Sequence, residues 1–129
     1  MLRFVVKGRP RGKGRPRFGG GHAYTDPETR AAEEQIAWSA KAVGAKASTQ
    51  CARVSITASF KPCKTECAKA KASTIVGPYL KKPDGDNILK LVCDALNGVA
   101  WVDDCQVYSA SIDKFYGNED QIEVVIEYL

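Results

Sequence analysis

The segment from Asp86 to Asn97 restricts the fold most strongly, because as an α-helix it would be apolar on all but one narrow stripe. In a helical projection its polar side chains fall within about one hundred degrees of arc. The apolar remainder needs a partner surface, and we expect this helix to be buried against a β-sheet. The polar stripe consists of Asp86, Asn87, Lys90, Asp94 and Asn97.

Alternation of apolar and polar residues predicts the strands of that sheet. The clearest alternation covers residues 53–60, and a short alternating segment over residues 2–7 opens the chain. Two further strands are expected at residues 106–114 and 121–128, joined as a hairpin by a turn at residues 116–119.

Capping residues and prolines locate the helices. Thr25 or Asp26 can cap a helix that runs to about Gly44, and Pro83 favours a second helix that starts just after it. The order strand, helix, strand, helix, strand, strand predicts an α+β fold, with a mixed β-sheet packed against two main helices. A length of 129 residues suits a single domain that covers residues 1–129.

Composition excludes several protein classes. With 44% hydrophobic and 26% charged residues, the chain is neither disordered nor fibrous in character. No apolar run reaches the roughly 20 residues that span a bilayer, so we expect a cytoplasmic protein without membrane contact. Five cysteines, an odd number, favour free thiols in a reducing compartment. Cys63 and Cys67 lack the further ligands of a structural zinc site, because His22 is the one histidine.

A basic arm, residues 8–23, follows the first strand. It is rich in glycine and proline, which predicts a loop that is mobile when unbound. Seven basic residues and no acid lie between Arg3 and Arg17, and residues 61–82 form a second basic segment with at most a short helix. Cations on such segments suit phosphate contacts. The residues expected to bind DNA are Arg9, Arg11, Lys13, Arg15, Arg17, Lys81 and Lys82.

Carboxylates are concentrated later in the chain, where five of the fifteen acidic residues lie between Asp84 and Asp104. Several carboxylates on rigid elements suit a hard divalent cation such as Mg2+. Structural alternatives exist for each of them. Asp84 or Asp86 could cap the helix, and Asp86 and Asp94 could pair with Lys90 on the helix surface. Asp103 and Asp104 could simply form a turn. Spacing alone leaves both interpretations open.

Three sequence motifs resemble the RusA family of Holliday junction resolvases. They are K-P-D-G-D-N-I-L-K at residues 82–90, D-A-L-N-G at 94–98 and W-V-D-D-C-Q-V at 101–107. Their order and spacing agree with the family, and parts of the arm and residues 114–117 resemble its phage and prophage members. The resemblance covers nearly the whole chain. Gly85 departs from the pattern, because family members often have an aliphatic residue there.

The resemblance implies a homodimeric endonuclease that requires Mg2+, or Mn2+ in its place. Such an enzyme cuts branched DNA, specifically four-way junctions, by paired nicks during recombination and repair in a bacterial or phage-infected cell. It implies metal binding and catalysis by three acids that should converge on one site, a catalytic lysine, and three supporting residues. The three acids are Asp84, Asp86 and Asp104, and the lysine is Lys90. The supporting residues are Asn87, Asp94 and Asp103. The alternative is a non-catalytic phage or prophage DNA-binding protein, in which the acids are caps and surface pairs.

Overall fold

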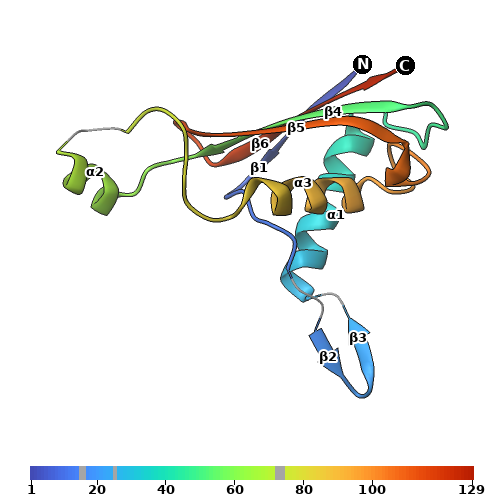
Figure 1. Cartoon of the computed structure of the whole chain (residues 1–129), viewed down its shortest axis with the longest axis horizontal. Helices are drawn as coiled ribbons and strands as arrows, with labels where there is room; N and C mark the ends of the chain where they lie inside the picture. Colours follow the sequence, from blue (N-terminus) through green and yellow to red (C-terminus); the bar gives the residue numbers. More distant parts are fainter. Residues whose placement is uncertain (15–16, 25, 72–74) are drawn as a thin grey trace.

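Four strands form a mixed β-sheet in the computed structural model, which describes residues 1–14, 17–24, 26–71 and 75–129. The strands are β1 (Leu2–Lys7), β4 (Ala52–Phe60), β5 (Val107–Tyr116) and β6 (Gln121–Tyr128). Their order across the sheet is β1-β6-β4-β5 (Figure 1). β4 and β5 run parallel, whereas β6 is antiparallel to both of its neighbours. The mixed sheet confirms the predicted α+β class.

The last two strands do not form the predicted hairpin, because β4 lies between β5 and β6. Strands β4 and β6 bury alternate side chains, which suits the middle of the sheet. The matching face of β5 carries Lys114 and half-buried residues such as Ile112, which suits an edge strand. Alternation therefore predicted which face each strand buries, but not which strands are neighbours.

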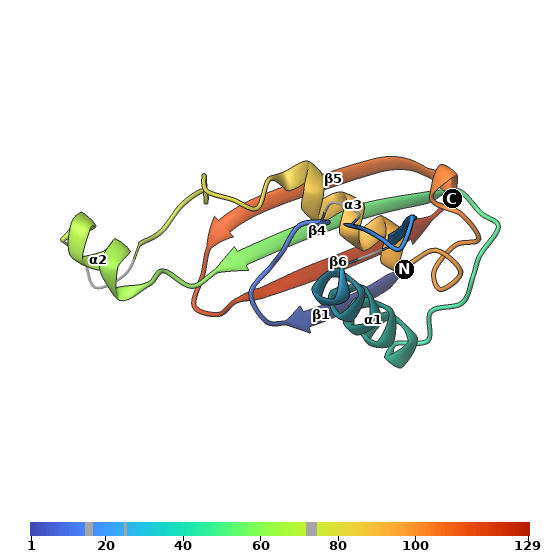
Figure 2. The same cartoon turned by 90° about the horizontal axis from the view of Figure 1, so that it is seen from below.

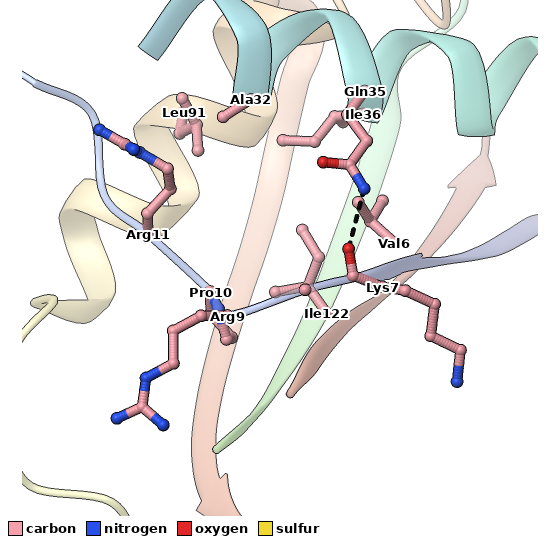
Figure 3. Close-up of a pocket in the computed structure, with 11 residues that line it drawn as sticks. Val6, Lys7, Arg9, Pro10, Arg11, Ala32, Gln35, Ile36, Leu91 and Ile122 are labelled. Atoms are coloured by element: carbon pink, nitrogen blue, oxygen red, sulfur yellow. Dashed lines mark hydrogen bonds between the residues drawn. The ribbon is translucent and has the colours of Figure 1, made fainter. Parts of the chain in front are cut away.

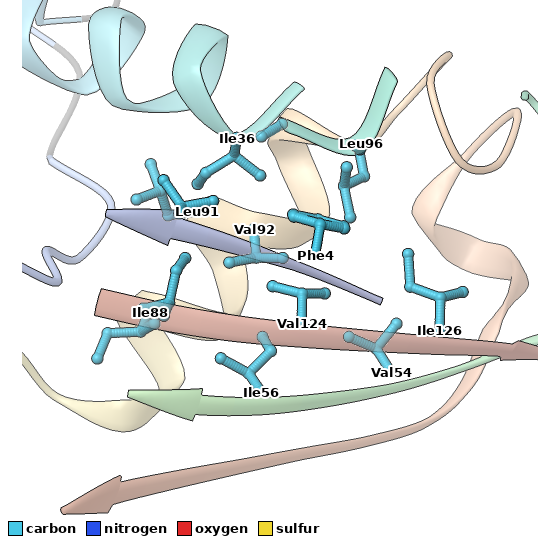
Figure 4. Close-up of a cluster of buried hydrophobic side chains, with 14 of the residues drawn as sticks. Phe4, Ile36, Val54, Ile56, Ile88, Leu91, Val92, Leu96, Val124 and Ile126 are labelled. Carbon is cyan, nitrogen blue, oxygen red and sulfur yellow. The ribbon is translucent and has the colours of Figure 1, made fainter. Parts of the chain in front are cut away.

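Two helices cover one face of the sheet and leave the other face open (Figure 1, Figure 2). Helix α1 (Pro27–Ala42) packs on β1, and helix α3 (Gly85–Ala95) packs on β5. The apolar side of α3 is buried as predicted. In the parts of the chain that the structure describes, no helix has the length and apolarity to cross a membrane. The hydrophobic core beneath the helices includes Phe4, Val54, Ile56, Ile88, Leu91, Val92, Val124 and Ile126 (Figure 4).

Helix α1 begins and ends close to its predicted limits. Asp26 occupies the N-cap position without a side-chain capping hydrogen bond, and Thr25 lies outside the described residues. Ile36 and Ala40, one helical turn apart, are buried. Val43 continues the spacing of these two residues, but it is 44% exposed because the helix ends one residue before it.

The outer part of the basic arm is a hairpin, which corrects the prediction of a loop. Strands β2 (Arg17–Gly19) and β3 (His22–Tyr24) pair antiparallel and project away from the sheet (Figure 1). Gly20 and Gly21 form the connecting turn with φ angles of 59° and 79°. Glycine adopts this left-handed conformation without a steric penalty, so two adjacent glycines permit a turn this tight.

Residues 61–82, which form most of the segment between β4 and α3, are called the lobe. Its described residues contain one short helix, α2 (Lys64–Ala70), as predicted. Helix α2 lies beyond the end of the sheet (Figure 1, Figure 2). Because the lobe connects the last residue of β4 to the start of α3, it protrudes at the end of the molecule where α3 begins.

Candidate active site along helix α3

Asp84 and Asp86 lie at the start of α3, on either side of Gly85, and both are exposed. Asp84 occupies the N-cap position, yet its side chain makes no capping hydrogen bond. Within the described residues, neither carboxylate has an ion-pair or hydrogen-bond partner. Capping, the structural alternative for Asp84, is therefore not the role of this side chain in the structure.

Lys90 lies one helical turn after Asp86 on the polar stripe of α3. Its side chain is exposed, and no carboxylate in the described ranges forms an ion pair with it. The surface pairs considered for Lys90 thus do not form. Asn87, on the same stripe, contacts the arm instead, because its carbonyl accepts a hydrogen bond from the Lys13 backbone N–H at 3.0 Å.

Asp94 is bound by the arm. The Lys13 ammonium lies 3.2 Å from the Asp94 carboxylate and also binds Glu33 of α1. Burial lowers the pKa of Lys13, but its hydrogen bonds to Glu33 and Asp94 outweigh this effect and raise the pKa overall. One cation therefore ties the arm to both helices.

Asp103 and Asp104 lie in the turn that returns the chain to the sheet, as one alternative predicted. Asp104 begins a 3-10 turn, η1 (Asp104–Gln106), immediately before β5. Gln106 fixes this turn, because its Oε1 accepts hydrogen bonds from the backbone N–H groups of Val102 and Asp103 at 2.9 and 3.0 Å. Its Nε2 donates to the Ser48 carbonyl at 2.8 Å, which anchors the turn to the chain before β4.

The carboxyl of Asp104 lies in an acidic environment. Desolvation raises its pKa, and the neighbouring carboxylates of Asp103 and Asp94 raise it further. Burial, together with the charges of Asp104 and Asp94, raises the pKa of the Cys93 thiol to about 11. These shared effects indicate that Asp104 lies near Asp94, at the carboxyl end of α3.

The two groups of acids therefore lie toward opposite ends of α3. Asp94 follows Asp86 by eight residues, which corresponds to about 12 Å along the helix axis. Because β4 and β5 are parallel, the helix between them runs in the opposite direction, and the turn before β5 lies at its carboxyl end. In the described ranges, no three Asp, Glu, His or Cys side chains are grouped so that they could hold a metal ion. The structure does not show Asp84, Asp86 and Asp104 converging on one site, and metal binding stays a prediction.

Comparison with known proteins adds a second line of evidence. A family model described as endodeoxyribonuclease RusA matches residues 7–127. The chain belongs to the RusA family. YqaN, an uncharacterized protein of Bacillus subtilis (strain 168), is 49% identical to this RusA family member over 45 residues. That match covers 35% of this chain and 32% of YqaN, so the chain spans about a third of the length of this curated relative.

Three arm cations of the RusA chain are bound by internal acids. The guanidinium groups of Arg9 and Arg11 lie 3.1 and 3.2 Å from the carboxylates of Asp120 and Glu28. Lys13 is bound to the helices by the ion pairs already described. DNA phosphates would have to compete with these acids, and DNA binding by the arm stays a prediction. The side chains of Arg15 and Arg17, which are also predicted to bind DNA, lie outside the described parts of the structure.

The lobe of the RusA chain carries more available cations. Its 22 residues include six lysines and one acid, Glu66. Lys81 lies 3.2 Å from Glu66, and Tyr116 donates a hydrogen bond to the same carboxylate at 2.8 Å. Hydrogen bonds from Tyr116 first, and from Cys63 and Lys81, lower the pKa of Glu66 to about 2. The described lobe lysines without an ion pair are Lys61, Lys64, Lys69, Lys71 and Lys82.

The residues that fix the backbone around these acids were not predicted from the sequence. Gln106 belongs to a recognised motif, but its hydrogen bonds across the turn depend on tertiary structure. Tyr79 and Lys114 bind the turn before Asp84. A signal for Lys114 existed, because it stands at an inward-facing position of an alternating strand, where a polar side chain needs hydrogen-bond partners.

A small, mostly apolar pocket lies between the arm and the two helices (Figure 3). Leu91 of α3, Ile36 of α1 and Ile122 of β6 line it. Gln35 donates a hydrogen bond to the Lys7 carbonyl at 2.8 Å and so ties α1 to the end of β1. The pocket marks where the first residues of the arm cross between sheet and helices.

Proposed function

We propose that this RusA family member is an Mg2+-dependent endonuclease that resolves four-way DNA junctions by paired nicks. Membership of an endodeoxyribonuclease family supports DNA cleavage. The observation that carries the proposal is the pair of exposed carboxylates, Asp84 and Asp86, which within the described residues neither cap α3 nor bind a cation. Free carboxylates repel a polyanion unless a cation intervenes, so a protein that only binds DNA gains nothing from them.

The donor set at the start of α3 fits a hard cation. Mg2+ prefers oxygen ligands and is commonly held by one or two carboxylates, with water and substrate phosphate in its remaining positions. Asp84 and Asp86 offer two carboxylates of this kind. When bound there, Mg2+, or Mn2+ in its place, would activate a water and stabilise the leaving phosphate oxygen. In this proposal Asp84 and Asp86 are the primary ligands of the ion.

Lys90 and Asp104 have separate proposed roles. The Lys90 ammonium is exposed one turn beyond Asp86, and a free cation there can stabilise negative charge that develops on the phosphate. Asp104 lies toward the other end of α3, so it joins the metal site only if the substrate or a second protomer changes the geometry. Cleavage of both strands of a junction needs two such sites, and we propose that a homodimer supplies them.

The lobe provides the proposed contact with DNA close to Asp84. The lobe lysines that form no ion pair with a described residue are carried by the segment that leads into α3, so phosphates bound to the lobe would lie beside the proposed cleavage site. Cation–phosphate contacts of this type provide affinity without sequence specificity. Lys81 and Lys82, both predicted from the sequence to bind DNA, belong to this surface.

The test is a nicking assay with a synthetic four-way junction and a linear duplex of the same sequence. We expect cleavage of the junction in Mg2+, no cleavage in EDTA, and little cleavage of the duplex. Asp86→Asn should abolish cleavage and preserve or tighten junction binding, since it removes a metal ligand and a negative charge. Asp113→Asn, an exposed carboxylate on β5, is the matched control and should cleave normally.

Two outcomes would contradict the proposal. Junction binding without cleavage in either Mg2+ or Mn2+ would favour a non-catalytic DNA-binding protein. Normal cleavage by Asp86→Asn would favour a structural role for this carboxylate, because asparagine can substitute for aspartate at helix starts.

A further inference from the structure

The turn before Asp84 is held by side chains from distant parts of the chain. Lys114 of β5 donates hydrogen bonds from its ammonium to the carbonyls of Lys81 and Pro83, at 2.6 and 2.8 Å. The hydroxyl of Tyr79 donates to the intervening Lys82 carbonyl at 3.2 Å. Three consecutive carbonyls immediately before Asp84 are thus bound by two side chains.

Both side chains are themselves fixed. The ring of Tyr79 is 4% exposed and stacks on Phe60, with ring centroids 3.7 Å apart. Its hydroxyl accepts a hydrogen bond from Arg9 at 3.1 Å, which leaves its proton for the Lys82 carbonyl. The Lys114 ammonium lies 5.4 Å from the centre of the Tyr79 ring, within the range of a cation–π contact.

Lys114 has no carboxylate partner among the described residues. An ammonium that faces the protein interior without an acid is costly unless carbonyls and aromatic faces replace its water. Here the described contacts of the ammonium are to the carbonyls of the turn and to the ring of Tyr79. Because its ammonium is bound in this way, Lys114 is not available to contact the substrate. Any effect of Lys114 on catalysis must therefore act through the backbone that it holds.

We propose that Lys114 and Tyr79 are positioning residues that fix the turn at residues 81–83 and thereby orient the carboxylates of Asp84 and Asp86. The side chain of Asp84 makes no capping bond that could orient it locally. The first hydrogen bond of α3, from the Ile88 N–H to the Asp84 carbonyl at 3.2 Å, depends on the backbone of that turn. The consequence for catalysis rests on the proposed function of these carboxylates.

The test compares Lys114→Met, which has a similar length but no donor, with Lys114→Arg, whose guanidinium can donate to two carbonyls. Tyr79→Phe removes one donor and retains the stacked ring. Lys46→Met, at an exposed residue away from the lobe, is the control. In the metal-free protein we expect amide hydrogen exchange at Ile88 to accelerate about tenfold in Lys114→Met, with exchange at Leu96 unchanged.

The second measurement is single-turnover cleavage of the four-way junction at saturating protein. Lys114→Met should cleave at least about tenfold more slowly with an unchanged junction Kd, and Lys114→Arg should recover much of that loss. Tyr79→Phe should show a smaller loss than Lys114→Met.

The outcomes separate this inference from the proposed function. Unchanged exchange at Ile88, equal acceleration at both ends of α3, or wild-type cleavage by Lys114→Met would each overturn the positioning role. A wild-type protein that does not cleave the junction would overturn the proposed function, while a local change in exchange at Ile88 would still support the positioning of the turn.

Discussion

Lys13 lies 3.2 Å from Asp94, and this contact joins the basic arm to the carboxyl half of α3. The side chains of the pair are 19% and 26% exposed, so water only partly screens the interaction. Glu33 of α1 binds the same ammonium. Removing the cation would leave two carboxylates facing each other, which makes this ion pair a structural contact between three segments.

Lys13→Met should therefore lower the free energy of unfolding by about 1–2 kcal/mol, between the values typical of exposed and buried pairs. Asp94→Asn in the same chain should recover part of the loss, because it removes one of the two repelling charges. Urea unfolding of the two single variants and the double variant measures this coupling. If the effects of the two single variants on the free energy of unfolding add up to that of the double variant, the Lys13–Asp94 pair does not stabilise the protein.

Gly12 allows the arm to pass close to α3. A Cβ at this position would lie 2.8 Å from the Cβ of Asn87, which is closer than non-bonded carbon atoms normally approach. Gly12→Ala should displace the arm and destabilise the protein by about 1–3 kcal/mol, the usual cost of overpacking. Thermal unfolding measures the effect. If the clash is the cause, Gly12→Ala should cost less in an Asn87→Gly background than in the wild type.

The lobe should dominate the salt dependence of DNA binding. Each neutralised phosphate contributes about 0.9 to the slope of log K against log salt, so Lys64→Gln with Lys69→Gln should flatten it by up to about 1.8. Arg9→Gln with Lys13→Gln should change the slope less, because both residues already bind acids. Fluorescence anisotropy with a labelled junction between 50 and about 200 mM salt gives the slopes. A larger change in slope for the Arg9 and Lys13 variant than for the Lys64 and Lys69 variant would contradict this prediction.

Glu66 should make the stability of the lobe depend on acid pH. The hydrogen bond from Tyr116 is the main cause of its pKa of about 2, well below the ordinary value of 4.5 for a glutamate carboxyl. A lowered carboxyl pKa stabilises the folded state fully above the unfolded pKa, and this contribution is lost as pH falls through the folded pKa. The difference in free energy of unfolding between wild type and Tyr116→Phe should be constant above about pH 5 and should shrink towards pH 2.

Tyr128→Phe is the matched control for that measurement. The Tyr128 hydroxyl donates to the Ala100 carbonyl at 2.6 Å, which does not titrate. Its stability difference from wild type should therefore stay constant over the same acid range. Parallel pH profiles for the two tyrosine variants would contradict the role assigned to Glu66.

Much of the fold was predictable from the sequence, because periodicity reports directly on burial. The alternation at residues 53–60 and the apolar side of residues 88–96 both predicted side chains that the structure buries. Periodicity does not report neighbours, since a central strand and an edge strand of one sheet can show the same pattern. The position of β4 between β5 and β6 was therefore not predicted.

The sequence by itself determined the candidate residues at the start of α3, because the spacing of Asp84, Asp86 and Lys90 on one helix is local geometry. Only the tertiary structure decided which charges remain available. It paired Lys13 with Asp94 and placed Asp104 toward the far end of α3. Ion pairs between residues distant in sequence depend on how helices cross the sheet, and the direction of α3 relative to β5 follows from strand pairing that no local pattern encodes.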